Sequence, residues 1–165
     1  MSSITKTTYY PQIFDEKVAD GAYEYLEKNI DWRDSIFSKR KNKVTRKGYS
    51  SQGINEIDEY IDQLVEIGLS KIEQKYVALG IYVNYYRDGI RDFCPNHTHP
   101  GTVQMVISLG ATRTLQVGKR DYPMKSGDMI VFGASSHGVP EEPDVKSGRI
   151  SIAVFLKKKP DDVVV

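Results

Sequence analysis

The spacing of apolar residues predicts two helices in the first half of the chain. Residues 13–30 and 54–76 both repeat apolar side chains at intervals of three and four residues, the pattern of an amphipathic helix. Acidic residues lie near the start of the second stretch and lysines near its end, as the helix dipole favours. Between the two stretches lies a polar, basic connection over residues 32–53, which we expect to be an exposed hairpin or loop.

From residue 77 onward the pattern changes to short apolar runs separated by glycine, proline and aspartate. Six runs predict strands, at residues 78–86, 102–110, 112–118, 122–125, 128–133 and 149–157. Closely spaced strands after two helices favour a double-sheet jelly roll over a βαβ fold. The predicted fold class is therefore α+β, a double-stranded β-helix (jelly roll) backed by N-terminal helices.

We predict a single domain over residues 1–165, a length typical of one domain. Residues 1–76 would form the helical support with a basic lid segment, residues 77–158 the metal-binding jelly-roll core, and residues 159–165 a loosely ordered tail. No apolar run approaches the roughly 20 residues that span a bilayer, and the N-terminus lacks the layout of a signal peptide. We expect a soluble, intracellular monomer, cytoplasmic or nuclear and without a membrane partner.

Net charge is +1, so the whole chain gives no electrostatic sign of a polyanionic partner. Residues 38–47 differ from this average, because they contain six basic residues and no acidic one. The six are Lys39, Arg40, Lys41, Lys43, Arg46 and Lys47. A run of this kind is usually a solvated surface loop, and it also suits neutralisation of phosphates.

All three histidines of the chain can belong to one site. His97 and His99 are two residues apart, so on an extended chain their rings point to the same side. His137 follows a turn, a strand and a loop of small residues that could return it to the same place. Imidazole suits iron, zinc, copper and nickel, so the ligands alone do not name the metal.

Short matches in a fixed order make residues 32–165 resemble the AlkB-like family of iron(II)/2-oxoglutarate-dependent oxygenases. The matches are Asn84 and Tyr86 for the family's N-x-Y, the pair His97 and His99, the segments "SLGATR" and "MKSGDMIVFG", then His137, and the strand "RISIAVF" that opens with Arg149. The resemblance implies an oxygenase with Fe(II), 2-oxoglutarate as co-substrate and O2.

The same resemblance assigns roles to these residues. His97, His99 and His137 would hold the iron and leave open positions for the keto acid and O2. Arg149 would pair with the far carboxylate of 2-oxoglutarate, with Asn84, Tyr86 and Ser151 completing the co-substrate site. Hydroxylation of an N-methyl group in the substrate would release formaldehyde.

Two residues depart from the family pattern. His99 stands where the family has an aspartate ligand, and Phe155 stands where it has a second arginine. Loss of the carboxylate makes the metal centre one unit more positive. An active three-histidine oxygenase, a metal-binding relative with a lost or changed reaction, and a different three-histidine enzyme are all compatible with this substitution.

The last of these interpretations has a pattern of its own. Cupins share the jelly-roll architecture and use H-x-H, then Glu or Gln, then a later His; this chain has His97, His99, Gln104 and His137 in that order. The alternative is therefore a cupin-like three-histidine metal protein, either a dioxygenase that does not use 2-oxoglutarate or a non-catalytic binding module.

The resemblance also bears on the substrate. In AlkB-like enzymes the segment before the core covers the substrate, often an alkylated base of DNA or RNA that must be unstacked. The basic residues from Lys39 to Lys47 fall in this region. We therefore predict a nucleic acid base as substrate and DNA or RNA as partner, against a protein side chain or a small molecule.

Overall fold

The computed structural model of the chain describes residues 6–34, 39–40, 43–44 and 46–160. The first half contains β1 (Thr8–Tyr10), α1 (Glu16–Asn29), β2 (Arg33–Asp34), β3 (Lys39–Arg40), β4 (Lys43–Val44), β5 (Lys47–Ser51) and α2 (Glu56–Ser70). The second half contains β6 (Tyr76–Tyr86), β7 (Cys94–His97), β8 (Val103–Gly110), β9 (Arg113–Val117), β10 (Arg120–Met124), β11 (Met129–Phe132), β12 (His137–Val139) and β13 (Arg149–Lys158).

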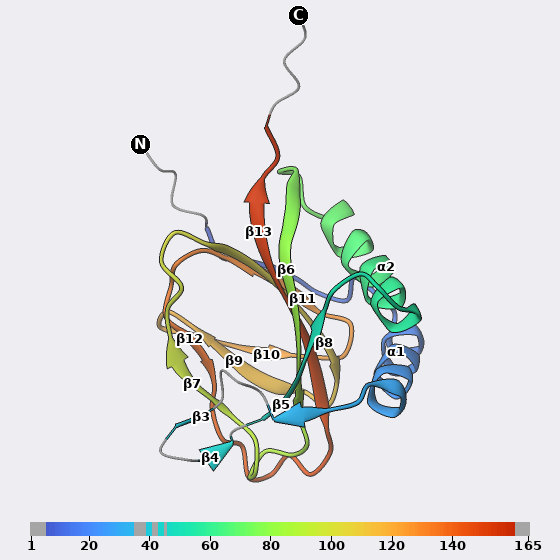
Figure 1. Cartoon of the computed structure of the whole chain (residues 1–165). Helices are drawn as coiled ribbons and strands as arrows, with labels where there is room; N and C mark the ends of the chain where they lie inside the picture. The colour runs from blue at the N-terminus through green and yellow to red at the C-terminus, as the bar shows by residue number, and fades with distance from the viewer. Residues whose placement is uncertain (1–5, 35–38, 41–42, 45, 161–165) are drawn as a thin grey trace, which may run out of the picture.

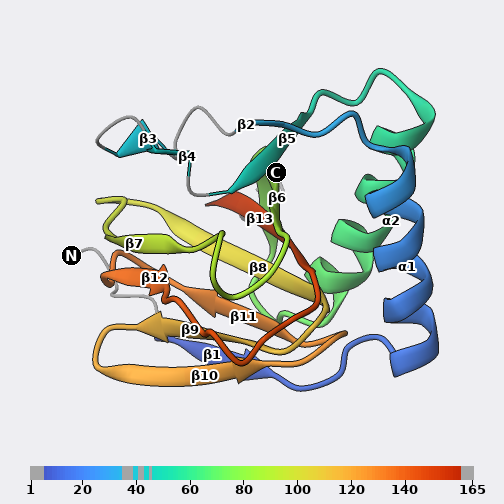
Figure 2. The ribbon, with the colours of Figure 1, turned by 90° about the horizontal axis from the view of Figure 1, so that it is seen from below.

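The strands form two facing sheets, with both helices against the outer face of the larger one (Figures 1 and 2). The larger sheet has the order β1-β11-β8-β13-β6-β5-β2, the smaller one β10-β9-β12-β7, and β3 pairs with β4 in a separate hairpin. All these pairs are antiparallel. The arrangement confirms the predicted jelly roll backed by N-terminal helices. In the part of the chain that the structure describes, neither helix is long and apolar enough to cross a membrane.

Strict alternation along β8 and β13 gives the larger sheet two different faces. Ile107 and Ile152 belong to a core that the sheet shares with Leu26 of α1 and Ile61 of α2. On each strand, the residues that alternate with the core residues point the other way, toward the smaller sheet, and line a cavity there. These are Gln104 and Val106 on β8, and Arg149, Ser151, Ala153 and Phe155 on β13. The same strands therefore hold the helices on one side and build a candidate site on the other.

The predicted exposed connection over residues 32–53 is wrong in part. Lys47–Ser51 form β5, which pairs with β6 inside the larger sheet, and Arg46 just before it is buried. The polar composition of this segment conceals the strand, because β5 gains its backbone partners from β6 rather than from an apolar pattern. The predicted second helix is also too long, since α2 ends at Ser70 and the chain is already extended from Tyr76.

Gly127 and Asp128, the glycine and aspartate of "MKSGD", fix the N-terminal strand to the jelly roll. Asp128 is buried and accepts hydrogen bonds from the Tyr9 hydroxyl and, at 2.9 Å, from the Gln12 backbone N–H. Gly127 has φ of +97°, and a Cβ atom there would lie 2.4 Å from the carbonyl oxygen of Phe14. Only glycine fits this turn without strain or displacement of the neighbouring chain.

We therefore expect Gly127→Ala to lower the free energy of unfolding by about 1–3 kcal/mol, because the substitution combines a disfavoured φ with a clash against backbone. Chemical denaturation measures this change. Gly21→Ala is the matched control, since Gly21 lies in α1 with open space around its Cβ position; it should raise stability by about 0.4–1 kcal/mol. Equal stability of Gly127→Ala and the unsubstituted protein would contradict this role for Gly127.

Candidate metal centre

The three histidines come together at one point between the two sheets. One ring nitrogen from each of His97, His99 and His137 lies within 4.8 Å of the others, an arrangement that can hold one metal ion. His97 ends β7 and His137 begins β12, and the two residues are paired across these antiparallel strands. His99 lies beyond the end of β7, so a loop, not the alternation of a strand, turns its ring toward the other two.

Backbone carbonyls orient two of the rings. Nδ1 of His97 lies 2.8 Å from the carbonyl oxygen of Pro95, and Nδ1 of His137 lies 3.0 Å from that of Ser135. A ring that donates from Nδ1 presents its unprotonated Nε2 to a metal, the usual arrangement in metal sites. Burial lowers the pKa of His137 to about 4, so this ring is neutral and ready to coordinate at neutral pH.

The other two histidines differ in their environments. Burial lowers the pKa of His99, with a further contribution from the charge of His97. The contact with the Cys94 thiol, 3.7 Å from Nδ1, raises the pKa of His97. Because the cluster is crowded, three positive rings would repel one another, and a divalent metal on neutral rings removes this repulsion.

A cavity of about 680 Å³ opens beside the histidines, within the size range of small-molecule sites. The predicted co-substrate residues Asn84, Tyr86, Arg149 and Ser151 all line it. Asn84 and Tyr86 are alternate residues of β6 and face the same side, as predicted. Burial raises the pKa of Tyr86 to about 12, so its hydroxyl is neutral at neutral pH.

Arg149 is the least satisfied polar group that lines this cavity. It is 1% exposed, its Nε donates to Ser108 Oγ at 2.7 Å, and both of its terminal nitrogens are buried without a hydrogen-bond partner. Its Cζ lies 5.4 Å from the centre of the Tyr86 ring. Burial lowers the pKa of Arg149 to about 10, which still leaves it charged at neutral pH. Two unpaired parallel donors on a buried cation fit a carboxylate.

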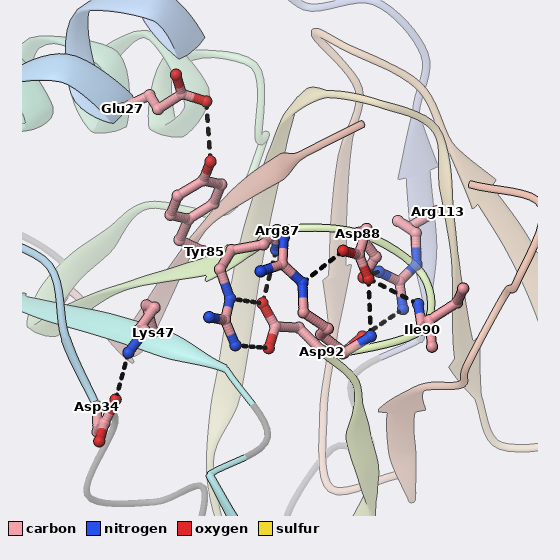
Figure 3. A network of polar contacts seen from close by, with 10 residues as sticks. Glu27, Asp34, Lys47, Tyr85, Arg87, Asp88, Ile90, Asp92 and Arg113 are labelled. Atoms are coloured by element: carbon pink, nitrogen blue, oxygen red, sulfur yellow. Dashed lines mark hydrogen bonds and ion pairs between the residues drawn. The ribbon is translucent and has the colours of Figure 1, made fainter. Parts of the chain in front are cut away.

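A second buried arginine holds the frame of the site. Arg113 donates to the carbonyl oxygens of Asp88, Asp92 and Pro140 at 3.0, 2.9 and 2.9 Å. The Asp92 carboxylate in turn receives Nε and a terminal nitrogen of Arg87 at 2.8 and 2.9 Å (Figure 3). This network fixes the loop between β6, which carries Tyr86, and β7, which carries His97. The sequence signal for Arg113 is the SLG-x-x-R match, but that match did not reveal its partners.

The two departures from the family pattern lie side by side. The ring centre of Phe155 is 5.2 Å from that of His99, at a nearly perpendicular angle. The site is therefore apolar where the family would have a cation. A different cation lines the cavity: Arg46, 7% exposed, whose Nε donates to Asn84 Oδ1 at 3.0 Å. Sequence reasoning missed this position, because Arg46 was one member of a basic run.

The other basic residues of segment 38–47 belong to different elements of the structure. Lys39, Arg40 and Lys43 belong to the β3–β4 hairpin, which lies on the same side of the molecule as β7 (Figures 1 and 2). Lys47 on β5 forms an ion pair with Asp34. Lys41, and residues 161–165 of the predicted tail, lie outside the described residues. The six basic residues therefore do not form one uniform surface strip.

No protein-family model and no curated protein matches the sequence. Solved structures do match the fold. A prolyl hydroxylase from Trichoplax adhaerens, solved with a peptide of hypoxia inducible factor, has a TM-score of 0.69 and 12% identity over 92% of this chain and 83% of its own. An oxidoreductase of the 2OG-Fe(II) oxygenase family from Burkholderia pseudomallei has a TM-score of 0.65 and 16% identity over 93% and 84%.

The carbocyclase SnoK from nogalamycin biosynthesis, described as non-heme and alpha-ketoglutarate-dependent, has a TM-score of 0.64 and 12% identity over 91% of this chain and 78% of its own. Identities this low establish a shared fold. The fold of this chain is thus one that 2-oxoglutarate–iron(II) oxygenases share. Prolyl hydroxylases and a carbocyclase share this fold, so the likeness does not single out the AlkB-like branch.

We expect His137→Ala to weaken iron(II) binding by more than about 100-fold, the upper end of the loss on removing a residue that only orients a ligand. Anaerobic isothermal titration calorimetry measures the affinity. Cys94→Ser is the control, because Cys94 contacts His97 but is not a ligand of the proposed set, and it should change affinity by less than about tenfold. Unchanged affinity in His137→Ala would show that the ligand set is wrong.

Proposed function

We propose that this protein is an iron(II)/2-oxoglutarate-dependent oxygenase. The observation that carries the proposal is Arg149, a fully buried guanidinium with two unpaired nitrogens in the same cavity as three clustered histidines. Leaving buried donors unpaired costs about 1–3 kcal/mol, and a carboxylate placed against Arg149 would remove that cost. The shared fold of oxygenases supports this assignment.

The residues of the cavity fit both iron(II) and 2-oxoglutarate. His97, His99 and His137 would hold the iron, and Arg149 would receive the far carboxylate of 2-oxoglutarate with Ser108 keeping the guanidinium in place. With both bound, the site would couple decarboxylation of 2-oxoglutarate by O2, giving succinate and CO2, to insertion of one oxygen atom into a substrate C–H bond.

The other residues of the cavity would orient the co-substrate and limit its contact with water. The neutral Tyr86 hydroxyl and the Asn84 amide, alternate residues on β6, would donate to oxygens of the co-substrate. Val106 and Leu115 contribute apolar walls that limit the access of water. Arg113 and its carbonyl partners hold the loop between β6 and β7, which would keep the co-substrate residues on β6 aligned with His97 on β7.

Anaerobic titration of the iron(II)-loaded protein with 2-oxoglutarate tests the proposal. We expect the weak visible charge-transfer band of a bidentate keto acid, and we expect Arg149→Ala to weaken 2-oxoglutarate binding by roughly tenfold or more, because a charge-assisted pair is lost. Arg120→Ala, an exposed arginine on β10, is the matched control and should leave the band unchanged.

Iron binding without the band would argue against the oxygenase and in favour of the cupin-like interpretation. In that case the substrate would bind directly to the metal, and no keto acid would be needed. Gln104, which follows the cupin order, does line the cavity. The titration therefore separates the two candidate functions.

His99→Asp tests whether His99 is a weaker replacement for the aspartate ligand of the family pattern. Aspartate would return one negative charge to the metal centre, so we expect succinate formation from 2-oxoglutarate to rise severalfold. His99→Asn, similar in size but uncharged, is the control and should not show the increase. Equal or lower turnover in His99→Asp would mean that the site is adapted to three histidines.

The finer proposal is oxidative demethylation of a nucleic acid base, as in AlkB-like enzymes. Its support is the order of sequence matches and the position of the basic β3–β4 hairpin on the side of β7, where a lid would lie. The burial of Arg46 and the ion pair of Lys47 leave fewer cations for phosphates than the run contains. Release of formaldehyde from a methylated single-stranded oligonucleotide is the measurement that tests this substrate.

A further inference from the structure

A row of three side chains crosses the middle strands of the larger sheet, on the face that lines the cavity. Gln104 of β8 pairs with Phe132 of β11 on one side and with Phe155 of β13 on the other. Residues paired directly across antiparallel strands place their side chains on the same face of the sheet, with Cβ atoms about 5 Å apart. Gln104 therefore lies between two phenylalanine side chains.

Both ends of this row contact the histidine cluster. The ring centre of Phe132 is 4.8 Å from that of His137, and the ring centre of Phe155 is 5.2 Å from that of His99. Gln104 itself lines the same cavity as the histidines. Because its two neighbours in the row contact different histidines, Gln104 lies at the metal end of the cavity.

The amide of Gln104 is available to a ligand. The residue is 4% exposed, and its Nε2 has no hydrogen-bond partner in the described part of the chain. A buried amide donor without an acceptor is unfavourable, and an oxygen atom of a molecule bound in the cavity would remove that cost. Among the described residues that line the cavity, Gln104 and Arg149 carry the buried side-chain nitrogens that lack a partner. The cavity therefore offers unpaired donors at two places.

The spacing of these donors suits one short dicarboxylate. Arg149 donates from Nε to Ser108, which pairs with Ser151, so its guanidinium lies two residues further along β13 than its own backbone. From Ser151 to Phe155, the partner of Gln104, is four residues, or about 13 Å. A five-carbon dicarboxylate with a hydrogen bond of about 2.9 Å at each end spans a distance of this order.

The metal end of 2-oxoglutarate carries an acceptor for Gln104. A bidentate keto acid binds iron through its keto oxygen and one oxygen of the adjoining carboxylate. The other oxygen of that carboxylate stays free and keeps part of the negative charge, so it accepts strong hydrogen bonds. A neutral amide suits this position, because a three-histidine centre is one charge more positive than the family pattern and would repel a cation placed beside it.

We propose that Gln104 binds the metal end of 2-oxoglutarate, with its Nε2 donating to the carboxylate oxygen that the iron leaves free. This inference rests on the proposed function, because it takes the iron to lie on the histidines and the far carboxylate to lie against Arg149. The co-substrate is then held at both ends, by a guanidinium at one and an amide at the other. Gln104 keeps the keto acid in the orientation that chelates the iron.

Anaerobic titration of the iron(II)-loaded protein with two keto acids tests this role. Pyruvate has the same metal end as 2-oxoglutarate but no far carboxylate. Gln104→Leu removes the donor, so we expect it to weaken binding of both keto acids by a similar factor, roughly tenfold or more. Arg149→Ala should weaken binding of 2-oxoglutarate far more than that of pyruvate, because it removes the partner of the far carboxylate.

The charge-transfer band and two further variants make the test specific. The band should move to shorter wavelength in Gln104→Leu, since a hydrogen bond to the keto acid stabilises the orbital that accepts the electron. Gln104→Glu keeps the shape of the side chain but replaces the donor by an acceptor, so it should also weaken both keto acids. Gln116→Leu makes the same substitution on β9, outside the described lining of the cavity, and should leave both affinities and the band unchanged. Far-UV circular dichroism establishes that each variant is folded.

Other results would overturn the inference while leaving the oxygenase in place. These are a band in the unsubstituted protein with unchanged keto acid affinities in Gln104→Leu, or a loss of affinity confined to 2-oxoglutarate. Weaker iron(II) binding by Gln104→Leu in the absence of a keto acid, measured by calorimetry, would make Gln104 a metal ligand and would overturn the inference as well. If the unsubstituted protein binds iron but forms no band with either keto acid, the proposed function fails, and the inference that rests on it fails too.

Discussion

The hydrogen bond between Arg149 Nε and Ser108 Oγ is the interaction on which the candidate site depends. It joins β13 to β8 in the middle of the larger sheet and holds a charged group where water does not reach it. Because neither terminal nitrogen of the guanidinium has a hydrogen-bond partner within the protein, an acceptor bound against them would lower the free energy of the folded state. Folding and ligand binding are therefore coupled through one side chain.

The larger sheet tolerates the burial of the Arg149 guanidinium because its opposite face packs in the hydrophobic core against the helices. Ile107, Ile150 and Ile152 are fully buried against the helices, and removing such side chains from a core typically costs several kcal/mol. The polar residues of the cavity alternate with these apolar ones along the same strands. The helices are thus part of the site in an energetic sense, although they contribute no residue to its lining.

The elements whose apolar residues recur at short, regular intervals could be predicted from the sequence. The stripe of α2 and the alternation of β8 and β13 depend on neighbouring residues, so the pattern identified them. β7 and β12 could not be found in this way, because "CPNH" and "HGV" have no pattern of their own and become strands by pairing with each other and with β9. The three histidines were nevertheless grouped correctly, because the chain has no others to place elsewhere.

Long-range contacts explain what was missed. Arg46 reaches Asn84 across 38 residues, and nothing in a run of basic residues indicates which member turns inward. The walls of the cavity also come from separate elements: His97 and His137 from the smaller sheet, Arg149 from the larger one, and Arg46 from the segment before β5. Because Arg46 is held by Asn84 on β6, a substitution at Arg46 would change one wall of the cavity without touching the strands that carry His97 and His137. The shape of the cavity and the clustering of the histidines can therefore vary separately.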